Sequence, residues 1–104
     1  MPTSEPLTPT LRRAVRWLRH NCPTRTPTTV RVLAKQPGLH GLCHLSRGRA
    51  RITITLDTEA VMLDALLEEW CHVLRFDTPL PWEDDHDAVF WAIYGIVSKR
   101  WRKE

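Results

Sequence analysis

Long hydrophobic runs and any recognisable export signal are missing from this chain of 104 residues. No apolar stretch approaches the roughly 18–20 residues that a helix needs to cross a bilayer. The first six residues, M-P-T-S-E-P, lack the basic and apolar regions of a signal peptide. We therefore expect a cytoplasmic protein that makes no membrane contact.

Cysteine and glycine are also scarce, with three cysteines and four glycines. Cys22, Cys43 and Cys71 are widely spaced and form no C-x-x-C pair, which argues against a disulfide framework. The sequence has no glycine-rich phosphate loop and no G-x-S-x-G element, so it lacks the signatures of P-loop nucleotide-binding enzymes and of α/β-hydrolases. We expect the cysteines to be buried as small apolar side chains.

Acidic residues are almost absent from the first half of the chain. Residues 1–56 carry one acid, Glu5, against ten Lys and Arg, whereas residues 57–99 have a net charge of −8. A basic half of this kind indicates contact with a polyanion such as nucleic acid. The candidate contacts are seven arginines: Arg12, Arg13, Arg16, Arg19, Arg47, Arg49 and Arg51. The alternative is that the two halves attract each other within the folded domain.

The N-terminal region combines a loose segment with a helix. Residues 1–8 are rich in Pro and Thr and are expected to form a flexible N-terminus, followed by a single domain over residues 9–104. Thr8 and Pro9 fit the cap and the first position of an amphipathic helix, which should end near residues 21–23. Its outer surface is basic.

Three short segments that follow alternate between apolar and polar residues. They are residues 30–34, 39–45 and 51–56. The segment Ser46-Arg47-Gly48-Arg49, which leads into the last of them, predicts a hairpin turn. Together these segments predict a small antiparallel sheet of about three strands, and with the flanking helices an α+β fold.

Two helices are predicted in the second half. The longer runs from a cap at Asp57 or Thr58 to about Phe76, and the C-terminal helix runs from about Asp85 to Arg102. The apolar arc of the long helix is the main predicted core contact: Met62, Leu63, Leu66, Leu67, Trp70, Val73 and Leu74. The face beside this arc carries two carboxylates and one imidazole among apolar residues.

Those polar residues form an E-E-x-x-H pattern, Glu68, Glu69 and His72, with His86 fourteen residues later. Because side chains at i and i+4 share one helical face, Glu68 and His72 can bind one ion. His86, at the inward-facing start of the next helix, can supply a third ligand. Two imidazoles and one carboxylate leave a fourth position open, as in catalytic zinc sites. Glu69 would then be the general base that activates water.

A purely structural alternative explains the same residues. Glu68 and Glu69 would be acids on a partly exposed face, and His72 would be a hydrogen-bonded histidine. Arg75 would then be the ionic partner of Glu68 or of Asp64. Paired acids are common on helices, so the pattern alone does not decide between the two interpretations.

Two further clusters contain residues of ligand type. His40, Cys43 and His44, together with Cys22, do not have the spacing of a zinc finger. The acids within residues 83–87 lack the spacing of an EF-hand loop, and an acidic cluster at this place is typical of a helix N-terminus. We expect neither cluster to bind a metal.

Two segments resemble a known family. Residues 66–74, L-L-E-E-W-C-H-V-L, resemble the L-L-H-E-W-A-H-A-L helix of small SprT-like and phage-type zinc metallopeptidases, which are gluzincin-like. Residues 86–94, H-D-A-V-F-W-A-I-Y, are similar to the following H-x-x-x-(F/W)-W-x-x-Y helix of that family. The upstream order of a helix and short strands, with Gly41 two residues before Cys43, is similar too. This resemblance implies a minimal zincin-like fold.

The resemblance also implies roles for individual residues. Glu69 matches the catalytic glutamate, His72 and His86 match zinc ligands, and Glu68 stands where the family has a histidine. A carboxylate can also bind zinc, and its negative charge would favour manganese or another harder ion. The implied activity is hydrolysis of a peptide or protein substrate. The alternative function is that of an inactive relative that binds nucleic acid or a protein through the basic half of the chain.

Overall fold

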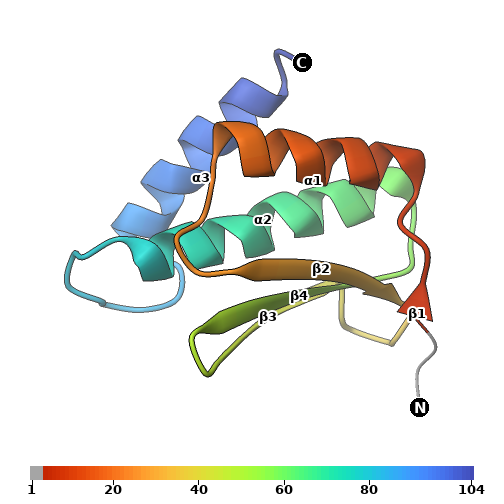
Figure 1. The fold of residues 1–104 in the computed structure, drawn as a ribbon, viewed down its shortest axis with the longest axis horizontal. Coiled ribbons are helices and arrows are strands. Elements are labelled where there is room, and N and C mark those ends of the chain that lie inside the picture. Colours follow the sequence, from red (N-terminus) through yellow and green to blue (C-terminus); the bar gives the residue numbers. More distant parts are fainter. Residues whose placement is uncertain (1–3) are drawn as a thin grey trace.

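The protein is built in two layers, with a small sheet on one side and three helices on the other (Figure 1). The computed structural model describes residues 4–104. In chain order the elements are β1 (Ser4–Glu5), α1 (Pro9–Asn21), β2 (Thr28–Leu33), β3 (Gly41–Ser46), β4 (Arg49–Thr55), α2 (Glu59–Asp77) and α3 (Ala88–Trp101). Helices α1 and α2 lie on the same side of the sheet, and α3 packs against α2. The predicted α+β class is confirmed.

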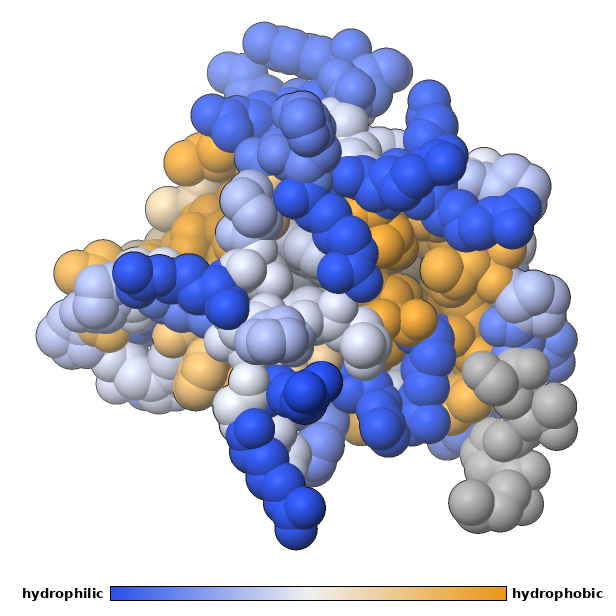
Figure 2. Space-filling model, in the orientation of Figure 1, coloured by the Kyte–Doolittle hydropathy of each residue, from blue (hydrophilic) through white to orange (hydrophobic). Residues whose placement is uncertain are grey.

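Hydrophilic side chains extend from both layers of the molecule. In Figure 2 they project beyond α1 at the top of the view and below the sheet at the bottom, with apolar surface visible between them. Among residues 4–104, no helix has the combination of length and apolar character that a bilayer-spanning helix needs.

Helix α1 begins and ends where its local sequence dictates. The side chain of Thr8 accepts a hydrogen bond from the backbone N–H of Leu11 at 3.2 Å, and Pro9 occupies the first helical position. The helix ends at Asn21 because Pro23 disfavours a helical conformation in the residue before it. Its buried residues are Leu11, Ala14, Val15 and Leu18, at helical spacing.

The N-terminal segment differs in part from the predicted loose tail. Ser4 and Glu5 pair antiparallel with Leu33 and Val32 of β2, so β1 is a short fourth strand of the sheet. Leu7 packs against the hydrophobic core. Residues 1–3 of the predicted flexible segment lie outside the described residues.

The sheet is mixed, which corrects the prediction of an antiparallel sheet. Its strand order is β1-β2-β4-β3, with β2 and β4 parallel and the other two pairs antiparallel. Strand β4 takes the central position because residues on both of its faces are buried, with Ile52 and Ile54 toward the helices and Thr53 and Thr55 on the other side. The chain therefore passes β2, forms β3 at the edge, and returns through a hairpin to place β4 between them.

Helix α2 is the central element of the helical layer. Thr58 caps it by accepting a hydrogen bond from the N–H of Val61. Most of the predicted apolar arc is buried, including Met62, Leu66 and Trp70. The indole N–H of Trp70 donates to the carbonyl of Cys22 at 2.8 Å, which ties α2 to the end of α1.

Helix α3 begins three residues later than predicted. Asp87 is its cap and accepts a hydrogen bond from the N–H of Phe90 at 2.9 Å, so the helix starts at Ala88. The acidic cluster of residues 83–85 lies in the preceding loop rather than in the helix. His86 is consequently an exposed residue just before the helix, and not its inward-facing first residue.

The position of Asp87 is set by a buried ion pair with Arg75. The guanidinium donates to the carboxylate oxygens of Asp87 at 2.9 and 2.8 Å and to the carbonyl of Pro81 at 2.7 Å. It also lies 4.9 Å from the ring centroid of Trp82. Asp87 is thus the partner of Arg75, in place of the predicted Glu68 or Asp64. These contacts hold the loop between α2 and α3 against the end of α2.

Removing Arg75 should therefore destabilise the whole domain. We expect Arg75→Met to lower Tm by at least about 10 °C in a calorimetric melt, because it leaves the Asp87 carboxylate buried without its partner. Arg16→Met is the matched control, an exposed helical arginine that should shift Tm by no more than about 3 °C. Equal shifts for the two variants would show that the ion pair is not a structural requirement.

Candidate metal centre

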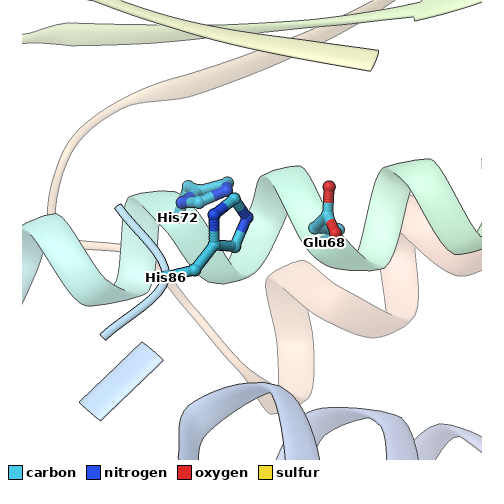
Figure 3. Close-up of side chains that lie close together, drawn as sticks. All are labelled: Glu68, His72 and His86. Carbon is cyan, nitrogen blue, oxygen red and sulfur yellow. The ribbon is translucent and has the colours of Figure 1, made fainter. Parts of the chain in front are cut away.

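Three ligand-type side chains from two segments meet beside α2 (Figure 3). Glu68 and His72 project from neighbouring turns of the helix, and His86 reaches over them from the segment that precedes α3. One ligand atom from each residue lies within 4.8 Å of the other two. The structure thus brings together the three predicted ligands, although His86 arrives from a turn and not from a helix.

The donor set suits a divalent metal ion. Tetrahedral zinc with bonds of about 2.0–2.1 Å holds its ligand atoms roughly 3.3 Å apart, so the three side chains would have to draw closer around an ion. Glu68 and His72 are half-buried and His86 is exposed, which leaves their side chains room for that adjustment. Two imidazoles and one carboxylate leave a fourth coordination position for a solvent or substrate oxygen.

Aromatic packing orients both imidazoles. The rings of His72 and His86 lie 4.7 Å apart at 72°, and His72 stacks on Phe90 at 4.4 Å. His86 in turn stacks on Trp91 at 5.7 Å. Burial, together with the neighbouring His86, lowers the pKa of His72. His72 is therefore neutral near pH 7, which is the form that binds metals.

Glu69 lies deeper than the three ligand-type residues. It is 7% exposed, and burial, followed by the negative charge of Glu68, raises its pKa to about 7. A carboxylate with that pKa exchanges a proton readily at neutral pH, as a general base requires. Perturbed acids of this kind are concentrated at functional sites.

Glycine at position 41 lets β3 approach α2 closely enough to bury Glu69. A Cβ added to Gly41 would lie 3.2 Å from the Cβ of Ala65 and 3.2 Å from the Cγ of Glu69. Cys43, two residues along the same face of β3, is half-buried, and burial together with Glu69 raises the pKa of its thiol to about 11. Glu69 is thus enclosed between α2 and the edge strand.

A cleft of about 280 Å³ opens beside Glu68. Its lining residues are His40, Val61, Asp64, Ala65, Glu68 and Tyr94. Sequence reasoning did not assign His40, Asp64 or Tyr94 to the site. Two signals could have identified two of them: Asp64 lies one turn before Glu68 on the same helix, and Tyr94 closes the segment 86–94 that resembles the family's second helix.

The two clusters that were expected to bind no metal are separated or engaged elsewhere. Cys43 and His44 are neighbours in β3 and therefore point to opposite faces of the sheet. Asp84 accepts a hydrogen bond from the N–H of His86, and Asp87 is bound to Arg75. Within residues 4–104, the triad of Glu68, His72 and His86 is the one group with the geometry to hold a metal ion.

The seven arginines proposed for nucleic acid do not share one surface. Arg12, Arg13, Arg16 and Arg19 belong to α1 in the helical layer, whereas Arg47, Arg49 and Arg51 belong to the β3–β4 hairpin. Two of the α1 arginines also have internal partners. Arg13 lies 5.2 Å from the ring of Trp101, and Arg19 donates to the carbonyl of Thr28 at 2.9 Å. The linear charge pattern therefore becomes two separate basic regions.

Comparisons with known proteins do not assign the chain to a family. No protein-family model, no curated protein and no solved structure matches it. The likeness to SprT-like metallopeptidases accordingly rests on the residue patterns within positions 66–94 and on the order of the preceding elements.

Proposed function

We propose that the protein is a metal-dependent hydrolase of peptide bonds. The convergence of Glu68, His72 and His86 beside the buried Glu69 carries this proposal. A bound divalent ion would act as a Lewis acid toward water and toward the carbonyl group of the substrate. Glu69, adjacent to Glu68 and with its pKa near neutrality, would accept the proton that the attacking water releases.

Zinc is the metal that best fits the donor set. Sites with two histidines and one carboxylate are typical of catalytic zinc. Glu68 supplies a negatively charged oxygen ligand where a third imidazole would be neutral. Because carboxylates suit harder ions, a binding experiment must also include manganese. Stacking on Phe90 and Trp91 keeps the two imidazoles beside each other, so an ion would need only to draw them closer.

The free edge of β3 favours an extended peptide as the substrate. Strand β3 is the last strand of the sheet, and among the described residues no strand pairs with its outer side. An extended peptide can add to such an edge through main-chain hydrogen bonds. His40, just before β3, and Glu68 line the same cleft, so a peptide on this edge would pass the proposed metal.

Metal binding is the first test of this function. We expect the purified, metal-free protein to bind about one equivalent of zinc in a calorimetric titration. His72→Ala and His86→Ala should each weaken binding by more than about 100-fold, because the loss of even an outer-shell partner weakens metal sites by about 10–100-fold. His20→Ala, at an exposed position on α1, is the control and should bind normally. Absence of zinc, manganese and cobalt binding would overturn the proposal.

The role of Glu69 can be separated from metal binding. We expect Glu69→Gln to retain one equivalent of metal but to lower kcat/KM for a quenched fluorescent peptide by at least about 100-fold, because the amide cannot accept a proton. Glu59→Gln, an exposed carboxylate at the start of α2, is the matched control. Unchanged turnover in the Glu69 variant would remove this residue from the mechanism.

Glu68 can be tested by restoring a third imidazole. We expect Glu68→His to keep one equivalent of zinc and to raise the rate of peptide cleavage, because a neutral ligand leaves more positive charge on the ion to polarise water. The measurement is kcat at saturating zinc, compared with the unaltered protein. If the variant binds zinc and neither protein cleaves peptides, the chain is a metal-binding relative without peptidase activity.

A further inference from the structure

The face of the sheet that points away from the helices carries a second candidate site. Side chains alternate along a strand, so the burial of Ala50, Ile52 and Ile54 toward the helices places Arg49 and Arg51 on the opposite face. A cavity of about 560 Å³ lies over this face. Its lining residues are Pro27, Thr29, His44, Ser46, Arg47, Arg49, Ala50 and Arg51. We call it the sheet groove.

Strand pairing concentrates the cations of the sheet groove. Arg51 of β4 lies opposite His44 of β3 on one side and Thr29 of β2 on the other. Arg31 is two residues beyond Thr29, on the same face of β2, and its Nε donates to Thr53 at 3.0 Å. Arg47, Arg49 and Arg51 therefore line the sheet groove, and Arg31 lies beside it on the same face of the sheet.

No ion pair within the described part of the chain involves these arginines. The ion pairs between residues 4 and 104 are Lys35–Asp57, His40–Asp57 and Arg75–Asp87, and none includes an arginine of the groove. The acidic half of the chain therefore does not pair with this surface through direct contacts. An array of unpaired guanidinium groups around a cavity is an electrostatic site for anions.

Arg47 places a positive charge in the hairpin turn, in a backbone conformation that is unfavourable for a long side chain. Arg47 has φ of 53° and Gly48 has φ of 73°, the left-handed conformation of a two-residue hairpin turn. Asparagine or glycine fits the first of these positions better than a long side chain does. The charged side chain of Arg47 lines the sheet groove beside Arg49.

We propose that the sheet groove binds the phosphate backbone of nucleic acid. Guanidinium groups form forked hydrogen bonds with phosphate, and hydroxyl groups such as those of Thr29 and Ser46 are common phosphate contacts. Arg49 and Arg51, two residues apart on a strand, are separated by roughly 6.6 Å along it, so they form a row and not a single-ion pocket. This arrangement matches a linear polyanion.

The same face argues against base recognition and against a protein partner. Strands β2, β3 and β4 contain no Phe, Tyr or Trp, so the groove has none of the large aromatic rings on which bases stack. It equally lacks the buried aromatic anchors that dominate protein interfaces. Binding is therefore independent of base sequence and strongly dependent on salt.

Fluorescence anisotropy with a labelled 20-base-pair DNA duplex of mixed sequence tests the proposal. Four phosphate contacts predict that log K falls with log salt with a slope of about −3 to −4. Arg49→Ser/Arg51→Ser should weaken binding by at least tenfold and make the slope shallower by about two. Arg12→Ser/Arg16→Ser removes the same charge from α1 and should change affinity by less than about threefold.

A single substitution at the turn gives an independent measurement. Arg47→Asn should raise Tm by a few degrees, because asparagine suits the left-handed position, and should still weaken DNA binding. If the Tm of this variant rises, a loss of DNA binding cannot be attributed to misfolding. Chelation of metal should leave DNA binding unchanged, because the sheet groove and α2 lie on opposite faces of the sheet. The two proposals can therefore fail independently of each other.

Three results would overturn the inference. The first is absence of DNA binding at 50 mM salt. The second is an equal loss of affinity in the sheet-groove and α1 variants, which would indicate general charge attraction. The third is equal binding of polyglutamate, which would show that the groove recognises carboxylate polymers and not phosphate.

Discussion

The buried ion pair between Arg75 and Asp87 determines where the C-terminal part of the chain returns to α2. The guanidinium binds the carboxylate and the carbonyl of Pro81, and the same carboxylate caps α3. Buried ion pairs are often no more stabilising than apolar residues of similar size, but they require one specific arrangement of the two groups. Its effect here is on position: Asp87 follows His86 directly, so the contact that starts α3 also brings the third ligand-type residue to Glu68 and His72.

The proposed metal centre combines residues that are unfavourable for stability. Glu69 is almost fully buried and forms no ion pair within residues 4–104, and its pKa rises to about 7 because burial penalises its charged form. Gly41 makes this burial feasible, since any side chain at that position would press against α2. Proteins concentrate such locally unfavourable arrangements at functional sites. The apolar arc of α2, headed by Trp70 and Leu66, provides the compensating core contacts.

The two proposed sites lie on opposite faces of one sheet, and β4 serves both. Its Ile52 and Ile54 pack toward the helices that carry the metal centre, while Arg49 and Arg51 face the sheet groove. This alternation places the basic residues of β4 on the face of the sheet that points away from the helices. The basic half contains α1 as well as the strands, and the acidic half contains α2 and the loop before α3, so the basic residues divide between α1 in the helical layer and the far face of the sheet.

Sequence alone determined the elements that depend on neighbouring residues. The cap at Thr8, the hairpin turn at Arg47 and the shared helical face of Glu68 and His72 follow from local geometry, and the structure confirms each of them. The tertiary structure decided the mixed strand order, the late start of α3 and the separation of the arginines into two regions. These features depend on contacts between residues far apart in the chain: β4 between β2 and β3, and Asp87 on Arg75. Local periodicity carries no information about which distant partner a buried strand or charge will find.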